Sequence, residues 1–305
     1  KYGFQKIENL AWVLGIGWFV ATLVVFLVGW VYAERALLPI KKLIGKVDEV
    51  TASRLDLRVE IPQEQDEIGQ LAQRFNRMLD RLQEAFLTQK AFVSNASHEL
   101  RTPLTAIRGQ IQVALMDDDP DEWKQTLESV LEDTQNLTKL SNGLLTMASV
   151  SVEENTVALA PVSLQRIFEE VKNELLKAHP SYTVLLNSPP TADTTVLGNN
   201  ALLRIALLNL TENGCKYSPN HTVNVAFKKQ GVFQQITFQN TGNPIAADEL
   251  PHIFKPFRRA ANSARIAGHG IGLSLTERIV WLHRGSIAVN SSTQEGTTFT
   301  LQLPI

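Results

Sequence analysis

The feature that most constrains this chain of 305 residues is an uncharged, apolar run near its start, from Leu10 to Tyr32. A helix of roughly 20 apolar residues spans the ~30 Å hydrocarbon core of a bilayer. Tryptophans stand towards both ends of the run, and Arg35 and two lysines follow it, as expected for interface anchors and a cytoplasmic flank. We predict a transmembrane helix at 10–32, with 1–9 as an extracytoplasmic flank. A buried core helix or an uncleaved signal peptide is the alternative.

Composition excludes several classes of protein. The chain is 44% hydrophobic and 20% charged, which is typical of folded proteins. Its formal net charge of -2 gives no global reason to expect a nucleic-acid partner, because proteins that bind the phosphate backbone usually carry a basic face. Cys215 is the single cysteine, so neither an intrachain disulfide nor a cysteine zinc cluster can form from this chain alone.

Two amphipathic stretches follow the apolar run, one after Pro39 and one from Ile68 to Leu82. We predict two short helices joined by an extended connector, over 33–87. Their apolar seams need a partner helix, which a homodimer supplies. An ordinary coiled-coil spacer is the alternative.

The residues of this region resemble a HAMP linker. The resemblance is carried by Leu38-Pro39-Ile40, by the connector end Arg58-Val59-Glu60-Ile61-Pro62, and by Asp66-Glu67-Ile68-Gly69. It implies a parallel four-helix coiled coil that passes motion from the membrane to an enzyme.

A helical hairpin is predicted over 88–150. Apolar residues recur at helical spacing from Phe92 to Leu115 and again from Trp123 to Ala148. Between them, Asp119 can cap the second helix with Pro120 at its first position. Two helices bury little surface alone, so pairing of two hairpins into a four-helix bundle again favours a dimer.

The last part, 151–305, alternates between strands and helices, which predicts an α/β domain with a mixed sheet covered by helices on one face. The strands are expected at 183–186, 223–227, 232–239, 286–289 and 297–303, and the helices at 164–178, 200–215 and 272–283.

His98 is the first candidate for chemistry. It lies on the predicted helix face opposite much of the apolar stripe, and Pro103 bends the helix below it. A neutral imidazole is a nucleophile near neutral pH, and the adjacent Glu99 can take its ring proton. An isolated histidine of this kind is more often a solvated surface residue.

The full string His98-Glu99-Leu100-Arg101-Thr102-Pro103-Leu104 resembles the phosphoacceptor box of sensor histidine kinases. The resemblance implies phosphorylation of His98 from ATP, transfer to an aspartate of a response-regulator receiver domain, and a place in the bacterial cytoplasmic membrane. It assigns to Thr102 the alignment of a water for dephosphorylating the partner. Bonding of that hydroxyl back to a helix carbonyl is the alternative.

A second constellation lies on one side of the predicted 200–215 helix: Asn209, Glu212, Asn213 and Lys216 recur at three- and four-residue spacing. Mg²⁺ prefers oxygen donors, and the lysine counters phosphate charge. The string through Tyr217 resembles the N box of the same kinases, in which the second asparagine, here Asn213, holds the metal. A polar helix face is the alternative. Neighbouring Cys215 is expected to pack into the core.

A glycine-rich string, Gly268-His269-Gly270-Ile271-Gly272-Leu273, precedes the last predicted helix. Glycines allow close approach of the backbone, and free amides at a helix start favour phosphate. The string is neither a Walker loop nor a dinucleotide fingerprint. With the segments around Phe254 and Gly296, it resembles the F, G2 and G3 boxes of the GHKL ATP-binding fold. The resemblance places an ATP lid at 258–267 and assigns nucleotide contacts to Phe257, Arg258, Gly268, Gly270, Gly272, Leu273 and Thr298.

One box departs from that family. Members usually show Asp-x-Gly-x-Gly at the adenine site, whereas this chain has Asn240-Thr241-Gly242-Asn243-Pro244-Ile245. Asn240 still offers an acceptor to the adenine amino group, with Gly242 and Ile245 beside it. Loss of the charge-assisted bond lowers the expected affinity by about one or two kcal/mol.

The sequence therefore predicts a multidomain chain: a transmembrane helix, a HAMP coiled coil, a four-helix-bundle dimerisation domain, and an α/β sandwich of the GHKL type that uses ATP and Mg²⁺. The predicted function is that of a sensor histidine kinase with phosphatase activity. One alternative is a scaffold or phosphatase impaired in ATP binding. Another is a GHKL ATPase of the chaperone or topoisomerase kind.

Overall fold

The computed structural model describes residues 2–51, 54–59, 67–116, 119–152, 158–188, 194–260, 266 and 268–305. The connector end at 60–62 and most of the predicted lid, 261–265 and 267, lie outside these described residues. The chain forms two compact units, 1–91 and 92–305.

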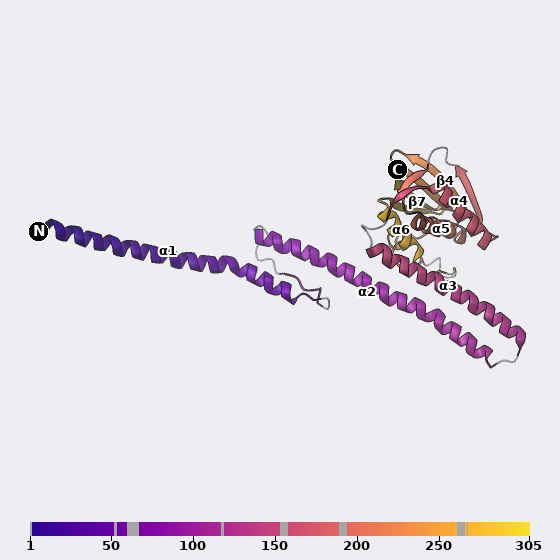
Figure 1. Cartoon of the computed structure of the whole chain (residues 1–305), viewed down its shortest axis with the longest axis horizontal. Coiled ribbons are helices and arrows are strands. Elements are labelled where there is room, and N and C mark those ends of the chain that lie inside the picture. Colours follow the sequence, from indigo (N-terminus) through magenta and orange to yellow (C-terminus); the bar gives the residue numbers. More distant parts are fainter. Residues whose placement is uncertain are drawn as a thin grey trace. The chain divides into compact units, whose positions relative to one another are not determined.

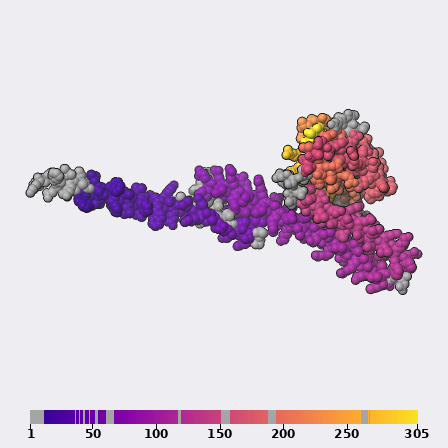
Figure 2. Space-filling model, viewed as in Figure 1, coloured from indigo at the N-terminus to yellow at the C-terminus, as the bar shows by residue number. Residues whose placement is uncertain are grey.

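The first unit begins with one long helix, α1 (Tyr2–Glu49). Its segment Trp12–Arg35 is long and apolar enough to cross a membrane, and none of it is buried. Figure 2 shows the surface of this indigo helix uncovered on the face in view. Pro39 was expected to open a separate short helix, but α1 continues through it, so the predicted break is wrong.

The connector packs on the start of helix α2 (Glu67–Ala114), and the bonds that hold it lie within the first unit. Asn76 on α2 accepts a hydrogen bond from Val59 N at Oδ1 and donates one from Nδ2 to Val59 O, both 2.9 Å. Arg58 pairs with Asp80 at 2.6 Å. Leu55 and Val59 are buried in this contact. The start of α2 at Glu67 agrees with the predicted start of the second helix.

The second unit starts with the hairpin formed by the end of α2 and by α3 (Pro120–Val152). The predicted cap is confirmed, because Asp119 Oδ1 accepts a hydrogen bond from Asp121 N at 2.9 Å. Pro120 occupies the first helical position, where its missing amide costs nothing. Helix α2 runs without a break from 67 to 114, so the predicted domain boundary at 87/88 lies inside one continuous helix.

An α/β domain follows the hairpin. Its main sheet has the order β2-β4-β5-β7-β6, in which only the β2–β4 pair is parallel. The strands are β2 (Thr183–Ser188), β4 (Thr222–Gln230), β5 (Phe233–Asn240), β6 (Ser286–Ser292) and β7 (Gly296–Pro304). A small antiparallel sheet, β1 (Ala160–Ser163) with β3 (Thr195–Gly198), was not predicted. The described residues of the domain also form the helices α4 (Leu164–Ala178), α5 (Asn200–Lys216) and α6 (Gly272–Leu282). A 3-10 turn, η1 (Leu250–His252), follows β5.

The core of the domain lies between the sheet and its helices, seen together in Figure 1. Burial alternates along β5 and β7, so one face of the sheet supplies the core side chains. Phe168 of α4 and Phe238 of β5 are among its largest fully buried residues. A second cluster joins Leu140 of α3 to Leu275 and Ile279 of α6. This second cluster attaches the α/β domain to the hairpin within the same unit.

Candidate functional site

His98 is exposed on α2, and neighbouring Glu99 is partly buried. The hydroxyl of Thr102 donates to the carbonyl of His98 at 3.2 Å, which is the back-bonded geometry of the alternative interpretation. Pro103 lies inside the helix one residue later. The acceptor histidine is therefore accessible, while the hydroxyl assigned to dephosphorylation is held by the backbone in this state.

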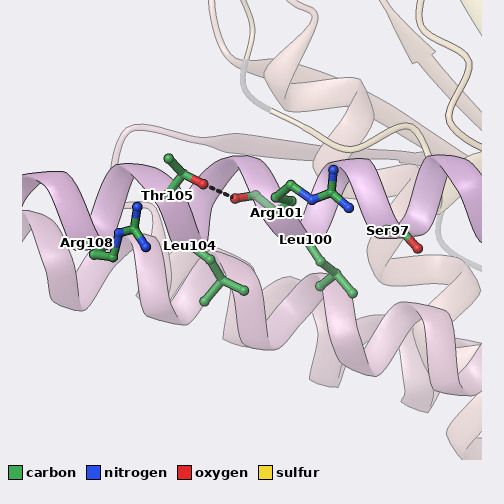
Figure 3. A pocket seen from close by; sticks show the side chains of 6 residues that line it. All are labelled: Ser97, Leu100, Arg101, Leu104, Thr105 and Arg108. Atoms are coloured by element: carbon green, nitrogen blue, oxygen red, sulfur yellow. Dashed lines mark hydrogen bonds between the residues drawn. The ribbon is translucent and has the colours of Figure 1, made fainter.

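The surface of α2 next to His98 carries a shallow depression lined by Ser97, Leu100, Arg101, Leu104, Thr105 and Arg108. Figure 3 shows Leu100 and Leu104 pointing the same way from the helix, with the guanidinium group of Arg101 turned away from them. Leu104 is 52% exposed. An apolar strip flanked by positive charge is a suitable surface for another protein.

A cavity of about 630 Å³ lies between the hairpin and the α/β domain. One wall comes from α3, including Asn136, Lys139 and Asn142. The opposite wall comes from α5, the end of β5 and the glycine-rich segment before α6. A volume of this size accommodates a nucleotide-sized ligand.

The α5 wall brings together the polar residues predicted from the sequence. Asn209, Glu212, Asn213 and Lys216 all line the cavity, as does Tyr217, which caps the helix. Asn209 also ties α5 to the start of α6, because its Nδ2 donates to Gly272 O at 3.3 Å. Burial lowers the pKa of Lys216, and the charge of Glu212 opposes that shift. A bound phosphate would satisfy this partly desolvated ammonium.

Asn240 closes one end of the cavity and is 5% exposed. Its Nδ2 donates to Thr241 O at 3.3 Å, which leaves Oδ1 as an acceptor for an exocyclic amine. Ile245 also lines this end, and its amide donates to Ser291 Oγ at 2.9 Å. The arrangement keeps an acceptor at the position that the sequence analysis gave to adenine recognition.

The glycine-rich segment lines the cavity with Gly268, Gly270 and Gly272, and Arg258 and Leu273 lie beside it. Gly270 has a φ of 68° and its carbonyl accepts a hydrogen bond from Phe257 N at 2.9 Å. A Cβ at Gly270 would lie 2.7 Å from Arg258 O, so only glycine fits without strain.

Three of the predicted contact residues do not line the cavity: Phe257, Gly242 and Thr298. Phe257 instead packs its ring on Phe92 of α2, with centroids 5.7 Å apart. Gly242 packs closely against the backbone of Tyr217, because a Cβ added at Gly242 would lie 2.5 Å from Tyr217 O. On β7 the lining residues are Thr297 and Phe299, because neighbouring side chains on a strand point to opposite faces and Thr298 lies between them.

No role was predicted from the sequence for the α3 wall, for Thr297 or for His269, which lines the cavity between two glycines. The α3 polar residues follow the ordinary pattern of a solvated helix face, so local sequence carries no signal for them. For Thr297 the alternation along the strand, in which Phe299, Leu301 and Leu303 are apolar, gave a usable signal. Cys215 packs in the core as predicted, and burial raises its pKa to about 11.

Comparison with known families accounts for most of the chain. Residues 31–84 match the HAMP domain, 88–152 match the His Kinase A (phospho-acceptor) domain, and 198–305 match the histidine kinase-, DNA gyrase B- and HSP90-like ATPase. This order of an apolar helix, a HAMP domain, a phosphoacceptor hairpin and an ATP-binding domain defines the sensor histidine kinases.

Similar curated proteins support the same family assignment. The chain is 31% identical over 287 residues to the sensor protein CutS of Streptomyces coelicolor, covering 92% of this chain and 69% of that protein. It is 29% identical to the sensor histidine kinase CusS of an Escherichia coli O6:H1 strain and to the sensor protein CzcS of Cupriavidus metallidurans. Those matches cover 93% and 96% of this chain, and 60% and 62% of the relatives' lengths. The chain belongs to the two-component sensor histidine kinases, enzymes that phosphorylate themselves and pass the group to a response regulator.

Two solved structures share the fold. Histidine kinase ThkA in complex with the response regulator protein TrrA has a TM-score of 0.57 at 20% identity, over 78% of this chain and 68% of that one. Acinetobacter baumannii histidine kinase AdeS has a TM-score of 0.53 at 21% identity, over 68% of this chain and 97% of that one. The predicted hairpin and α/β architecture is therefore confirmed.

Proposed function

We propose that His98 accepts the γ-phosphoryl group of Mg-ATP bound in the cavity between the hairpin and the α/β domain. The observation that carries this proposal is the shared cavity: its walls come from Pro103 and α3 of the phosphoacceptor hairpin and from the ATP-binding domain, while His98, Glu99 and Thr102 lie outside its lining. Phosphoryl transfer depends chiefly on positioning and on neutralising oxygen charge, and one cavity between the two parts supports both.

The residues present fit a nucleotide at this site. Asn240 accepts a hydrogen bond from the adenine amino group, and Lys216 and Arg258 lie where positive charge can meet the phosphates. The amides of Gly268 and Gly270 approach the phosphates closely because no side chain intervenes.

Mg²⁺ neutralises phosphate charge when it is bound, and Asn213 supplies an oxygen donor to it with Glu212 beside it. The described residues hold no group of three His, Cys, Asp or Glu side chains that could bind a metal. A hard cation held by one protein oxygen, phosphate oxygens and water matches that donor set.

The chemical step uses His98 and Glu99. One ring nitrogen of His98 forms a bond to the γ-phosphorus as the bond from that phosphorus to the bridging oxygen breaks and ADP leaves. The other ring nitrogen gives its proton to the Glu99 carboxylate, so the phosphorylated ring stays neutral. The phosphoryl group then passes to an aspartate of a receiver domain.

The same proposal assigns partners and location. Exposed leucines of the hairpin, Leu115 in its turn and Leu127 and Leu131 on α3, support pairing of two hairpins in a homodimer. The depression beside His98, with Arg101 and Arg108, suits an acidic receiver surface. The apolar helix and the basic residues after it support insertion in the bacterial cytoplasmic membrane with the catalytic part in the cytoplasm.

Incubation of the full chain in lipid nanodiscs with γ-labelled ATP and Mg²⁺ tests this function. We expect acid-labile label in the wild type and none in His98→Gln, with His179→Gln as a matched control that keeps its label. If the wild type takes no label in any lipid, the chain is a scaffold rather than a kinase. ATP hydrolysis unaffected by His98→Gln would instead indicate a GHKL ATPase.

A further inference from the structure

The two ends of the predicted lid meet at its base. Phe257 precedes the segment and Gly270 follows it, and the amide of the first donates to the carbonyl of the second at 2.9 Å. Both residues have positive φ, 62° and 68°. His269 is the neighbour of Gly270, so it belongs to this same base.

The lid base contacts the phosphoacceptor helix at two points. The Phe257 ring packs on Phe92, and His269 Nδ1 lies 3.2 Å from Glu99 Oε2. Phe92 and Glu99 are seven residues apart, so they lie two turns from each other on one face of α2. The second contact reaches the residue next to His98.

The His269 contact contributes little to stability. The side chains of His269 and Glu99 are 32% and 38% exposed, and partly solvated pairs of this kind are weak. Its geometry is more informative, because His269 lies between two glycines of the cavity wall and Glu99 adjoins the acceptor. The contact therefore joins the phosphate end of the cavity to the helix that carries His98.

We propose that His269 is a positioning residue for phosphoryl transfer, acting through Glu99. Its Nδ1 holds one oxygen of the Glu99 carboxylate, which fixes the side chain and sets the approach of the Gly268–Gly270 segment to α2. The second carboxylate oxygen is then left to take the ring proton of His98. This inference rests on the proposed function, in which Glu99 takes the ring proton of His98.

Replacements at 269 test the proposal on the full chain in nanodiscs. His269→Ala removes the contact, His269→Asn places an amide nitrogen close to the position of Nδ1, and His269→Gln places one nearer to that of Nε2. The two readouts are the rate of autophosphorylation at saturating Mg-ATP and the affinity for ADP measured by calorimetry. His179→Ala, at the end of α4, is the matched control.

We expect His269→Ala to slow phosphorylation about tenfold, since small misplacement of reacting groups is costly, with ADP affinity unchanged. His269→Asn should recover most of the rate, and His269→Gln should stay near the alanine variant. Unchanged ADP affinity also shows that each variant is folded.

A wild-type or faster rate in His269→Ala overturns the inference. Equal rates for the Asn and Ala variants, or a parallel loss of ADP affinity, overturn it as well. Failure of the proposed function looks different, because the wild type itself then takes no label or His98→Gln retains it.

Discussion

Gly214→Ala is a sensitive test of how α5 is held against the sheet. Gly214 lies inside α5 between Asn213 and Cys215 and is buried. Helix propensity alone favours alanine by about 0.5–1 kcal/mol. A Cβ at this position, however, would lie 2.8 Å from Val223 Cβ and closer still to its Cγ2. Rotation of Val223 cannot relieve a contact made by its own Cβ.

Overpacking of this kind costs about 1–3 kcal/mol, which exceeds the gain in propensity. We therefore expect a net loss of about 1 kcal/mol in the stability of the α/β domain. For a domain of this size, that corresponds to a fall of about 3 °C in its melting temperature. Affinity for ADP should fall too, because Asn213 precedes the shifted position and Lys216 follows it.

Scanning calorimetry of the full chain in detergent measures the effect, and the transition that ATP raises identifies the α/β domain. Gly143→Ala on α3 is the control, since its Cβ would meet only Ile271 Cγ2, at 3.8 Å. That variant should be neutral or stabilising. A rise in the ATP-sensitive transition for Gly214→Ala would refute the close packing of α5 on β4.

Three further predictions follow from the site and the core. Burial lowers the pKa of His283, whose Nε2 accepts a hydrogen bond from Asn199 N at 2.9 Å. The stability that the neutral ring contributes should be fully present above about pH 6.5 and should be lost as the pH falls through the lowered pKa. Urea midpoints measured across this range should fall less in His283→Gln than in the wild type. Asn240→Asp should keep or tighten ADP binding by calorimetry, and a large loss would show that the amide itself is required. Thr102→Ala should keep autophosphorylation of His98 and weaken dephosphorylation of the partner receiver, whereas equal loss of both activities would contradict the role given to that hydroxyl.

Local pattern was sufficient for most elements of the fold. The helix predicted at 164–178 is α4 itself, and all five expected strands are present in the main sheet. The local sequence pattern failed where the structure of a segment depends on residues outside that segment. Pro39 reads locally as a helix start, yet α1 runs through it. The short strand β1 is a strand only because it pairs with β3, thirty-odd residues away.

The candidate site divides in the same way. Sequence alone determined the acceptor box around His98 and the polar face of α5, because helical spacing fixes which of their residues lie together. Only the tertiary structure decided that Phe257 faces α2 rather than the cavity, and that His269 meets Glu99. These contacts join residues about 170 positions apart, and no local periodicity specifies how two separately folded surfaces meet.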